Sequence, residues 1–315
     1  MSDLSWSLPH CVSAPFSTLS YQPHYSARTS QVKVDGSLLL HRDLPYALAR
    51  DQFHLVYQPQ IDIRTDQIVG VEALLRWNHP LLGLVSPGVF IPLAEKTGLI
   101  MQLGDWVLRA ACAQYRTWHA AGCRQTKISV NVSARQLAAP GIASRMRMIV
   151  EEMGVPPESI DLEITESALI QDIGRCRSIM RELKDVGFTL SIDDFGTGYS
   201  NLSYLGELPF DTLKIDRAFV RPLDGAGRDS VRFLLAQAIV RMAHALKMEV
   251  VAEGVETERQ LASLTEMHCD RIQGFLYSPA IEPEEMGKLL RCDDAAPALR
   301  RRSAETFSLD SLAAP

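Results

Sequence analysis

The sequence predicts an α/β fold: a modified (β/α)8 barrel of the TIM type with one antiparallel strand. Eight β-type runs recur along the chain, and helical segments separate most of them, a pattern that implies a parallel sheet. The first two runs are joined by only six residues, Ile61 to Asp66. Parallel strands need a crossover of about a dozen residues, so these two should form an antiparallel hairpin. Polar residues stand near the ends of successive strands, which in such barrels form the active face.

The elements follow one another in a regular order. The expected strands are Phe53–Gln60, Gln67–Trp77, Lys127–Val132, Ile160–Thr165, Thr189–Ile192, Thr212–Ile215, Glu249–Ala252 and Arg271–Leu276. The expected helices are Leu38–Arg50, Gln102–Ala121, Ile142–Met153, Asp172–Val186, Ser230–Leu246, Glu256–Met267 and Pro283–Leu290. Gly122, Gly154 and Gly187 follow three of the helices, as glycine often does at a helix end. One helix has an amphipathic period, with a single face that carries Val231, Leu234, Leu235, Ala238, Ile239, Met242 and Leu246.

Composition predicts one large domain with two tails. The chain has 315 residues, of which 46% are hydrophobic. We expect a flexible lead-in over residues 1–37, a domain over 38–292 and a loose tail over 293–315. The net charge of −6 argues against a nucleic-acid binder, which would carry a basic stripe. The six cysteines form no Cys-x-x-Cys pair, and no secretory signal or membrane-length apolar run is present, so a cytoplasmic protein is expected.

The stretch TLSIDDFGTGYSN, from Thr189 to Asn201, carries the most concentrated polar signal. Its β-type run leads directly into Asp193 and Asp194. Neighbouring strand residues point to opposite faces, so two adjacent aspartates serve one site only where the strand is ending. The two glycines that follow are expected to supply that ending, because glycine adopts backbone angles closed to other residues. Taken alone, an Asp-Asp pair is most often a solvated turn.

The strand ends together predict a metal site. The polar residues at or near them are Glu72, Asn131, Glu163, Asp193, Asp194, Lys214, Glu253, Glu256 and Gln273. Five of the carboxylates, all but Glu256, converge if the barrel closes. Two unit charges ~4 Å apart repel by about 4 kcal/mol at an effective dielectric constant of 20, so such a pocket needs cations. Oxygen ligands without His or Cys favour Mg²⁺ or Mn²⁺. Two such ions suit phosphodiester hydrolysis, and Lys214 adds one more positive charge.

Each of these residues also has a structural explanation when it is taken alone. Asn131 is then a strand-end turn former, Glu253 a helix-start carboxylate and Lys214 a solvated lysine. Gln58 before Pro59 could simply terminate a strand, and Arg76 could pair with a surface acid. The functional interpretation is favoured because all the strand-end motifs occur in one chain.

These motifs, in this order, resemble the EAL-type cyclic di-GMP phosphodiesterases over roughly residues 38 to 291. They are Tyr57-Gln58-Pro59, Glu72-Ala73-Leu74-Leu75-Arg76, Asn131-Val132-Ser133, Glu163-Ile164-Thr165-Glu166, Asp193-Asp194-Phe195-Gly196-Thr197-Gly198-Tyr199-Ser200, Leu213-Lys214-Ile215-Asp216, Ala252-Glu253-Gly254-Val255-Glu256 and Gln273-Gly274-Phe275. The resemblance implies hydrolysis of cyclic di-GMP to linear pGpG with two ions, Mg²⁺ or Mn²⁺.

The resemblance also implies a role for each motif residue. The metal ligands would be Glu72, Asn131, Glu163, Asp193, Asp194 and Glu253, with Asp193 bridging the ions. The catalytic group would comprise Lys214, Glu253 and Glu166; Lys214 assists the attacking water, and Glu166 braces the loop after Asp194. The substrate would be bound by Gln58, Leu74, Arg76, Asp216, Glu256 and Gln273, with Arg76 on a phosphate and Gln58 on a guanine.

The chain departs from the family pattern at two places. Asn201 stands where the family often has Ser, and Pro279 and Ala280 replace its usual residues after the Gln-Gly strand. The second departure concerns the shape of the last loop. No cyclase segment or sensor domain is visible, so regulation is expected from the tails, from a homodimer or from a regulatory protein partner.

Two rival functions remain open from the sequence. One is a catalytically silent cyclic di-GMP receptor that acts through a protein partner; such a protein would be expected to lack part of the metal set or Lys214. The other is a two-metal phosphodiesterase that takes a different nucleotide.

Overall fold

Eight strands close into a barrel, and a ninth strand extends the sheet at one edge. The computed structural model describes residues 36–123, 126–169, 173–196, 205–225 and 227–291. The strands are β1 (Phe53–Asp62), β2 (Gln67–His79), β3 (Gly83–Val85), β4 (Lys127–Val132), β5 (Ile160–Thr165), β6 (Thr189–Phe195), β7 (Thr212–Ile215), β8 (Glu249–Glu253) and β9 (Arg271–Gln273). Their order is β1-β9-β8-β7-β6-β5-β4-β2-β3, and an additional pairing of β1 with β2 closes the barrel.

Only one barrel strand runs against the others. β1 is antiparallel to both of its neighbours, β2 and β9, whereas the pairs from β2 and β4 through to β8 and β9 are parallel. The expected hairpin of the first two strands is therefore confirmed, and so is the modified barrel. The short β3 pairs with β2 alone and was not expected from the sequence.

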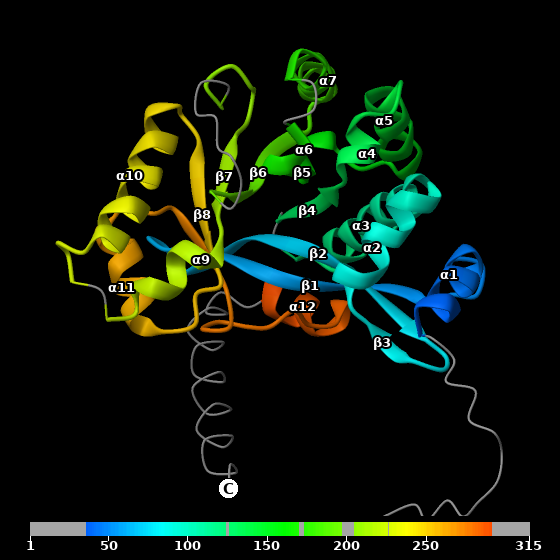
Figure 1. Ribbon diagram of the computed structural model, residues 1–315, viewed down its shortest axis with the longest axis horizontal. Helices are drawn as coiled ribbons and strands as arrows, with labels where there is room; N and C mark the ends of the chain where they lie inside the picture. The colour runs from blue at the N-terminus through cyan, green and yellow to red at the C-terminus, as the bar shows by residue number, and fades with distance from the viewer. Residues whose placement is uncertain (1–35, 124–125, 170–172, 197–204, 226, 292–315) are drawn as a thin grey trace, which may run out of the picture. The chain divides into compact units, whose positions relative to one another are not determined.

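Helices surround the strands (Figure 1). They are α1 (Gly36–Ala47), α2 (Pro87–Thr97), α3 (Ile100–Ala120), α4 (Ala134–Leu137), α5 (Ile142–Met153), α6 (Glu166–Leu169), α7 (Ile173–Val186), α9 (Arg217–Val220), α10 (Val231–Ala245), α11 (Glu258–Glu266) and α12 (Pro283–Leu290), with 3-10 turns η1 (Pro157–Ser159) and η2 (Arg221–Leu223). Gly122, Gly154 and Gly187 have positive φ angles, as expected after a helix. Sequence periodicity missed α2 and the one-turn helices that follow three of the strands.

The expected tails lie almost wholly outside the described residues. Of the lead-in, Gly36 and Ser37 belong to α1, and the rest is not described. The tail over residues 293–315 also lies outside the described residues, as do residues 197–204, which include Gly198 and Asn201.

The apolar face that the sequence period predicts for α10 does not point into the core. Val231 is 71% exposed, Leu234 50% and Leu235 51%, so the face that the period singles out lies largely in solvent. The buried positions of α10 are Phe233, Ala236, Val240 and Ala243. Because both faces of this helix carry apolar residues, periodicity alone could not choose between them.

Two apolar clusters hold the barrel together. The larger lies between the strands and the helices around them and includes Leu162 and Ile164, which are 0% exposed. The smaller packs α1, α2 and the start of α3 around Phe53, Trp77 and Phe90. Across the described chain, no helix has both the length and the apolar character needed to cross a membrane.

Candidate functional site

Asp193 and Asp194 face one site because Asp194 has an unusual backbone conformation. Its φ angle is +54°, in the left-handed region that aspartate tolerates better than most residues. The pairing of β6 with β7 is irregular between Ile192 and Phe195, so the regular alternation of side chains is interrupted there. β6 continues to Phe195, three residues beyond the expected end, and Gly196 follows it with a φ angle of +93°, as expected of a glycine that ends the strand. The sequence did not reveal the conformation of Asp194.

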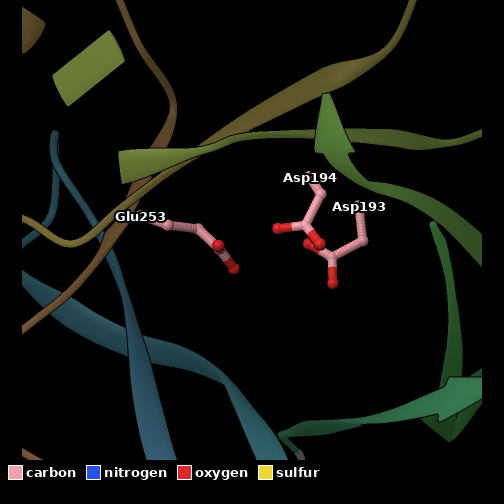
Figure 2. Close-up of side chains that lie close together, drawn as sticks. All are labelled: Asp193, Asp194 and Glu253. Carbon is pink, nitrogen blue, oxygen red and sulfur yellow. The ribbon is translucent and has the colours of Figure 1, made fainter. Parts of the chain in front are cut away.

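The two aspartates meet Glu253 from β8. One carboxylate oxygen from each of the three residues lies within 4.8 Å of the others. Figure 2 shows Glu253 on one side and the two aspartates on the other, with their carboxylates directed into the same space. Such a set of oxygen donors fits a hard divalent cation. Burial, followed by the charge of Asp193, raises the pKa of Asp194, and burial raises the pKa of Glu253 to about 7.

Lys214 lies at the centre of the carboxylates that line the barrel. Its Nζ is 2.6 Å from Glu163 Oε2 and 2.6 Å from Glu253 Oε1. It is also 3.2 Å from Asp193 Oδ1 and 3.6 Å from Glu72 Oε2. The residue is 1% exposed, and burial alone would lower its pKa. The surrounding carboxylates outweigh burial and raise the pKa of Lys214 well above its ordinary value, so this residue stays positively charged.

A hydrogen-bond network connects Glu72 to three other strands. Glu72 accepts from Asn131 Nδ2 at 2.8 Å and from Gln273 Nε2 at 2.6 Å. Gln273 Nε2 also donates to Gln58 Oε1 at 3.1 Å. Burial would raise the pKa of Glu72, but Lys214 and these donors lower it below its usual value. Lys214 and the amides together therefore favour the ionised Glu72 carboxylate, and the amide donors fix its direction.

Glu163 is the most enclosed carboxylate of the set. It is 1% exposed, and burial together with the charge of Glu72 raises its pKa well above the usual value. Its Oε2 contacts Lys214, whereas its Oε1 is buried without a hydrogen-bond partner among the described residues. The three-carboxylate group that includes Asp193 does not extend to Glu163.

Glu166 contacts the segment that follows the aspartates. It is the first residue of α6, beyond the end of β5, and its Oε2 accepts a hydrogen bond from the backbone N–H of Gly196 at 2.9 Å. Gly196 has a φ angle of +93°, and a Cβ there would lie 2.5 Å from the ring of Phe219. A side chain at position 196 would therefore disturb this contact.

An open pocket of about 300 Å³ adjoins the carboxylates. The predicted residues that line it are Gln58, Glu72, Leu74, Asp193, Glu253, Glu256 and Gln273. Arg217 and Phe275 also line it and were not among the predicted site residues. Phe275 belongs to the quoted motif Gln273-Gly274-Phe275, and Arg217 directly follows the motif residue Asp216, so the motifs were the available signal. Phe275 is 48% exposed, so an apolar ring is available at the pocket wall.

The two remaining predicted substrate contacts, Arg76 and Asp216, are not part of this lining. Arg76 is half-buried and donates from Nη1 to the carbonyl oxygen of Leu75 at 3.0 Å. It shares a face of β2 with Glu72 and Leu74 by the two-residue period. Asp216 caps α9 by accepting from the N–H of Ala218 at 2.8 Å, an alternative use of its carboxylate that the sequence did not reveal.

The same architecture occurs in solved structures. A structure of the PaMucR phosphodiesterase in complex with c-di-GMP matches with a TM-score of 0.75 and 44% sequence identity, over 79% of this chain and 99% of that chain. The EAL enzyme Bd1971, in a form with cAMP and cyclic di-GMP bound, matches with a TM-score of 0.75 and 30% identity, over 81% of this chain and 69% of that chain.

Sequence relatives point to the same family. The chain is 42% identical over 278 residues to the cyclic di-GMP phosphodiesterase NbdA of Pseudomonas aeruginosa. This alignment covers 88% of this chain and 35% of NbdA. It is 45% identical over 248 residues to the bifunctional diguanylate cyclase/cyclic di-GMP phosphodiesterase MucR of the same organism, over 79% of this chain and 36% of MucR. The chain thus spans about a third of the length of these curated relatives. The model of the EAL domain matches residues 41–280, and the chain belongs to the EAL domain family.

Proposed function

We propose that this chain hydrolyses cyclic di-GMP to linear pGpG with the help of two divalent cations, Mg²⁺ or Mn²⁺. The observation that carries the proposal is the meeting of Asp193, Asp194 and Glu253 beside an open pocket, with a charged lysine behind them. The c-di-GMP complex of a phosphodiesterase that is 44% identical supports the choice of substrate.

The cations would be held by the strand-end oxygen donors, namely Glu72, Asn131, Glu163, Asp193, Asp194 and Glu253. When bound, a pair of such ions lowers the pKa of a water and stabilises the attacking and leaving oxygens. Asp193, Asp194 and Glu253 supply the part of this set whose oxygens already lie together. Asn131 and Gln273 orient Glu72 through their amide donors.

The chain's own groups then bind and orient the dinucleotide. Gln58, Leu74, Glu256 and Gln273 line the pocket and would contact a guanine or the ribose. Arg76 and Asp216 would complete the proposed substrate contacts. Lys214 stays charged and would stabilise negative charge near the attacking water.

One assay tests the proposal against both rivals. The purified protein is incubated with cyclic di-GMP and Mg²⁺ or Mn²⁺, and pGpG is sought by chromatography. Cyclic di-AMP replaces the substrate in a second arm, and a chelator removes the cations in a third. Appearance of pGpG that depends on metal and on guanine supports the proposal. Tight binding without product indicates the silent receptor, and equal turnover of both dinucleotides indicates a less selective phosphodiesterase.

Glu166→Ala is expected to weaken metal affinity by about 10 to 100-fold. The Glu166 carboxylate accepts the N–H of Gly196, two residues after Asp194, so its loss frees the backbone that positions the aspartates. Activity measured against Mn²⁺ concentration should be partly restored at high metal. Ser167→Ala, on the same short helix, is the control and should leave the metal dependence unchanged. A Glu166→Ala protein that no metal concentration restores would place Glu166 among the direct ligands instead.

Arg76→Ala is expected to weaken substrate binding by about 1.5–3 kcal/mol, the range for a hydrogen bond to a charged group. Michaelis–Menten kinetics should show a raised KM with kcat changed much less. Arg109→Ala, on the outer helix α3 where Arg109 pairs with Glu152, serves as the control. An unchanged KM would contradict the assignment of Arg76 to a substrate phosphate.

We also propose that the chain forms a homodimer in the cytoplasm, through α10. Its exposed apolar residues Val231, Leu234 and Leu235 offer a face that a second copy would cover, and Ala238, also exposed, lies near the middle of the helix. An antiparallel pairing of two copies about Ala238 would bring Asp229 of one copy toward Lys247 of the other. Light scattering of the full chain measures the mass; a monomer at micromolar concentration would oppose this assembly and favour a regulatory protein partner.

A further inference from the structure

The interior of the barrel beneath the strand-end carboxylates is polar. Ser129, Asp161, Ser191 and Thr212 each lie two residues before a strand-end residue and therefore share its face. All four are buried. Barrels of this class are usually filled at this level by branched apolar side chains. A layer of hydroxyls around one carboxylate therefore needs an explanation.

Asp161 is the centre of this layer. Its Oδ2 accepts a hydrogen bond from Ser191 Oγ at 2.6 Å and another from Ser129 Oγ at 3.2 Å. A hydroxyl has one proton to donate, so both serines are committed to the same carboxylate oxygen. Asp161 is thereby fixed between β4 and β6.

A small cavity adjoins both this layer and the catalytic residues Glu163 and Lys214. Its volume is about 10 Å³, roughly the space that one water molecule needs. The layer lines it from below, and Glu163 and Lys214 line it from above. Lys127 and Arg271 also reach it, and their positive charges favour a neutral water over a cation. The lining supplies more than the two polar partners that a buried water requires.

Glu163 provides a second, independent observation. Its Oε2 takes the Lys214 ammonium at 2.6 Å, while its buried Oε1 has no hydrogen-bond partner among the described residues. A buried polar atom without a partner is destabilising, and a water in the adjoining cavity would supply a hydrogen-bond partner for Oε1. Such a water has a second proton for Asp161.

We propose that this cavity holds one ordered water that links Asp161 to Oε1 of Glu163, and that Asp161 is thereby a positioning residue. The water fixes the direction of the Glu163 carboxylate, and Glu163 in turn directs Lys214. The role of Asp161 in turnover rests on the proposed phosphodiesterase function, whereas the water does not.

Two variants of Asp161 test the link. Asp161→Leu removes the carboxylate at similar size. Asp161→Asn keeps one acceptor oxygen for the serines but replaces the other oxygen, which would accept from the water, with a hydrogen-bond donor. We expect kcat and the affinity for Mn²⁺, measured by calorimetry without substrate, to fall about 10 to 100-fold in Asp161→Leu and less in Asp161→Asn. KM should stay near its wild-type value, because Asp161 does not line the open pocket.

Asp211→Asn is the matched control. Asp211 also binds neighbouring groups, Lys184 and the N–H of Leu190, but it does not line the cavity. It should lower Tm without changing kcat or the Mn²⁺ dissociation constant. Asp161 variants that behave like this control would overturn the positioning role.

A high-resolution crystal structure with Mn²⁺ tests the water directly. We expect density in the cavity within hydrogen-bond distance of Asp161 and of Glu163 Oε1. A dry cavity, or an Oε1 atom bonded to the ion or to Glu72, would overturn the proposal. If the wild-type protein leaves cyclic di-GMP intact, the proposed function fails, and the density still decides whether the water is present.

Discussion

Asp193→Ala is expected to abolish cyclic di-GMP hydrolysis. Asp193 is one of the three carboxylates that lie together, it faces the open pocket, and it contacts Lys214 at 3.2 Å. Each of these relations is lost at once in the alanine variant. The remaining pair, Asp194 and Glu253, leaves too few oxygens in one place to hold a cation firmly. The measurement is pGpG formation across a range of Mn²⁺ concentrations, and no concentration should restore activity.

The same variant should remain folded. Carboxylates crowded around one ammonium repel one another, so removal of one relieves part of that repulsion and should leave Tm unchanged within a few degrees. Asp185→Ala, an exposed aspartate on α7, is the control for loss of an acidic residue outside the site. Activity of Asp193→Ala above a tenth of the wild-type value would remove Asp193 from the metal-binding set.

The order and direction of the strands could be predicted because they depend on short-range features. The six-residue link between the first two strands excludes a parallel crossover, and helical segments separate the later strands. Polar residues such as Glu72, Lys214 and Gln273 at the strand ends were visible for the same reason. Once the barrel closes, residues far apart in the chain must meet at one end, as they do.

Side-chain directions within the site could not be predicted, because they depend on local backbone geometry and on contacts between strands. The left-handed conformation of Asp194 is a property of one φ angle, which aspartate permits but does not require. Glu163, a proposed ligand, also contacts Lys214 and lines the small cavity beneath the site, and the sequence did not reveal either relation. Arg217, the first residue of α9, and Phe275, in the turn after β9, reach the pocket from beyond the strand ends, where no periodic pattern exists.

The sequence likewise could not predict which face of a helix is exposed to solvent. On α10, apolar residues occupy two faces, and the pattern singled out the one that contains Leu234 and Leu235. The side packed on the barrel carries Phe233, Ala236, Val240 and Ala243. Both sides are apolar, so a hydrophobic period does not tell which of them the barrel covers.

Lys214→Met is expected to lower kcat by about 10² to 10⁴-fold while cyclic di-GMP binding stays largely intact. The ammonium is 1% exposed and has carboxylates of four strands around it. These carboxylates raise the pKa of Lys214 well above its ordinary value, which favours an electrostatic role over that of a general base. That role is a positive charge with hydrogen-bond donors near the attacking water. Methionine keeps the aliphatic volume of the side chain and removes only the charge.

Binding, turnover and metal response separate this role from simple charge balance. Lys184→Met is the control, since Lys184 pairs with Asp211 on the outside of the barrel and should be dispensable for turnover. Calorimetry with a slowly hydrolysed analogue of cyclic di-GMP should give similar dissociation constants for both variants and the wild type. If Lys214 only neutralised the carboxylates, added Mn²⁺ would restore kcat of Lys214→Met; if it stabilises charge at the reacting water, the defect should persist at saturating metal. Weak binding with normal turnover at saturation would contradict both explanations and would make Lys214 a substrate-binding residue.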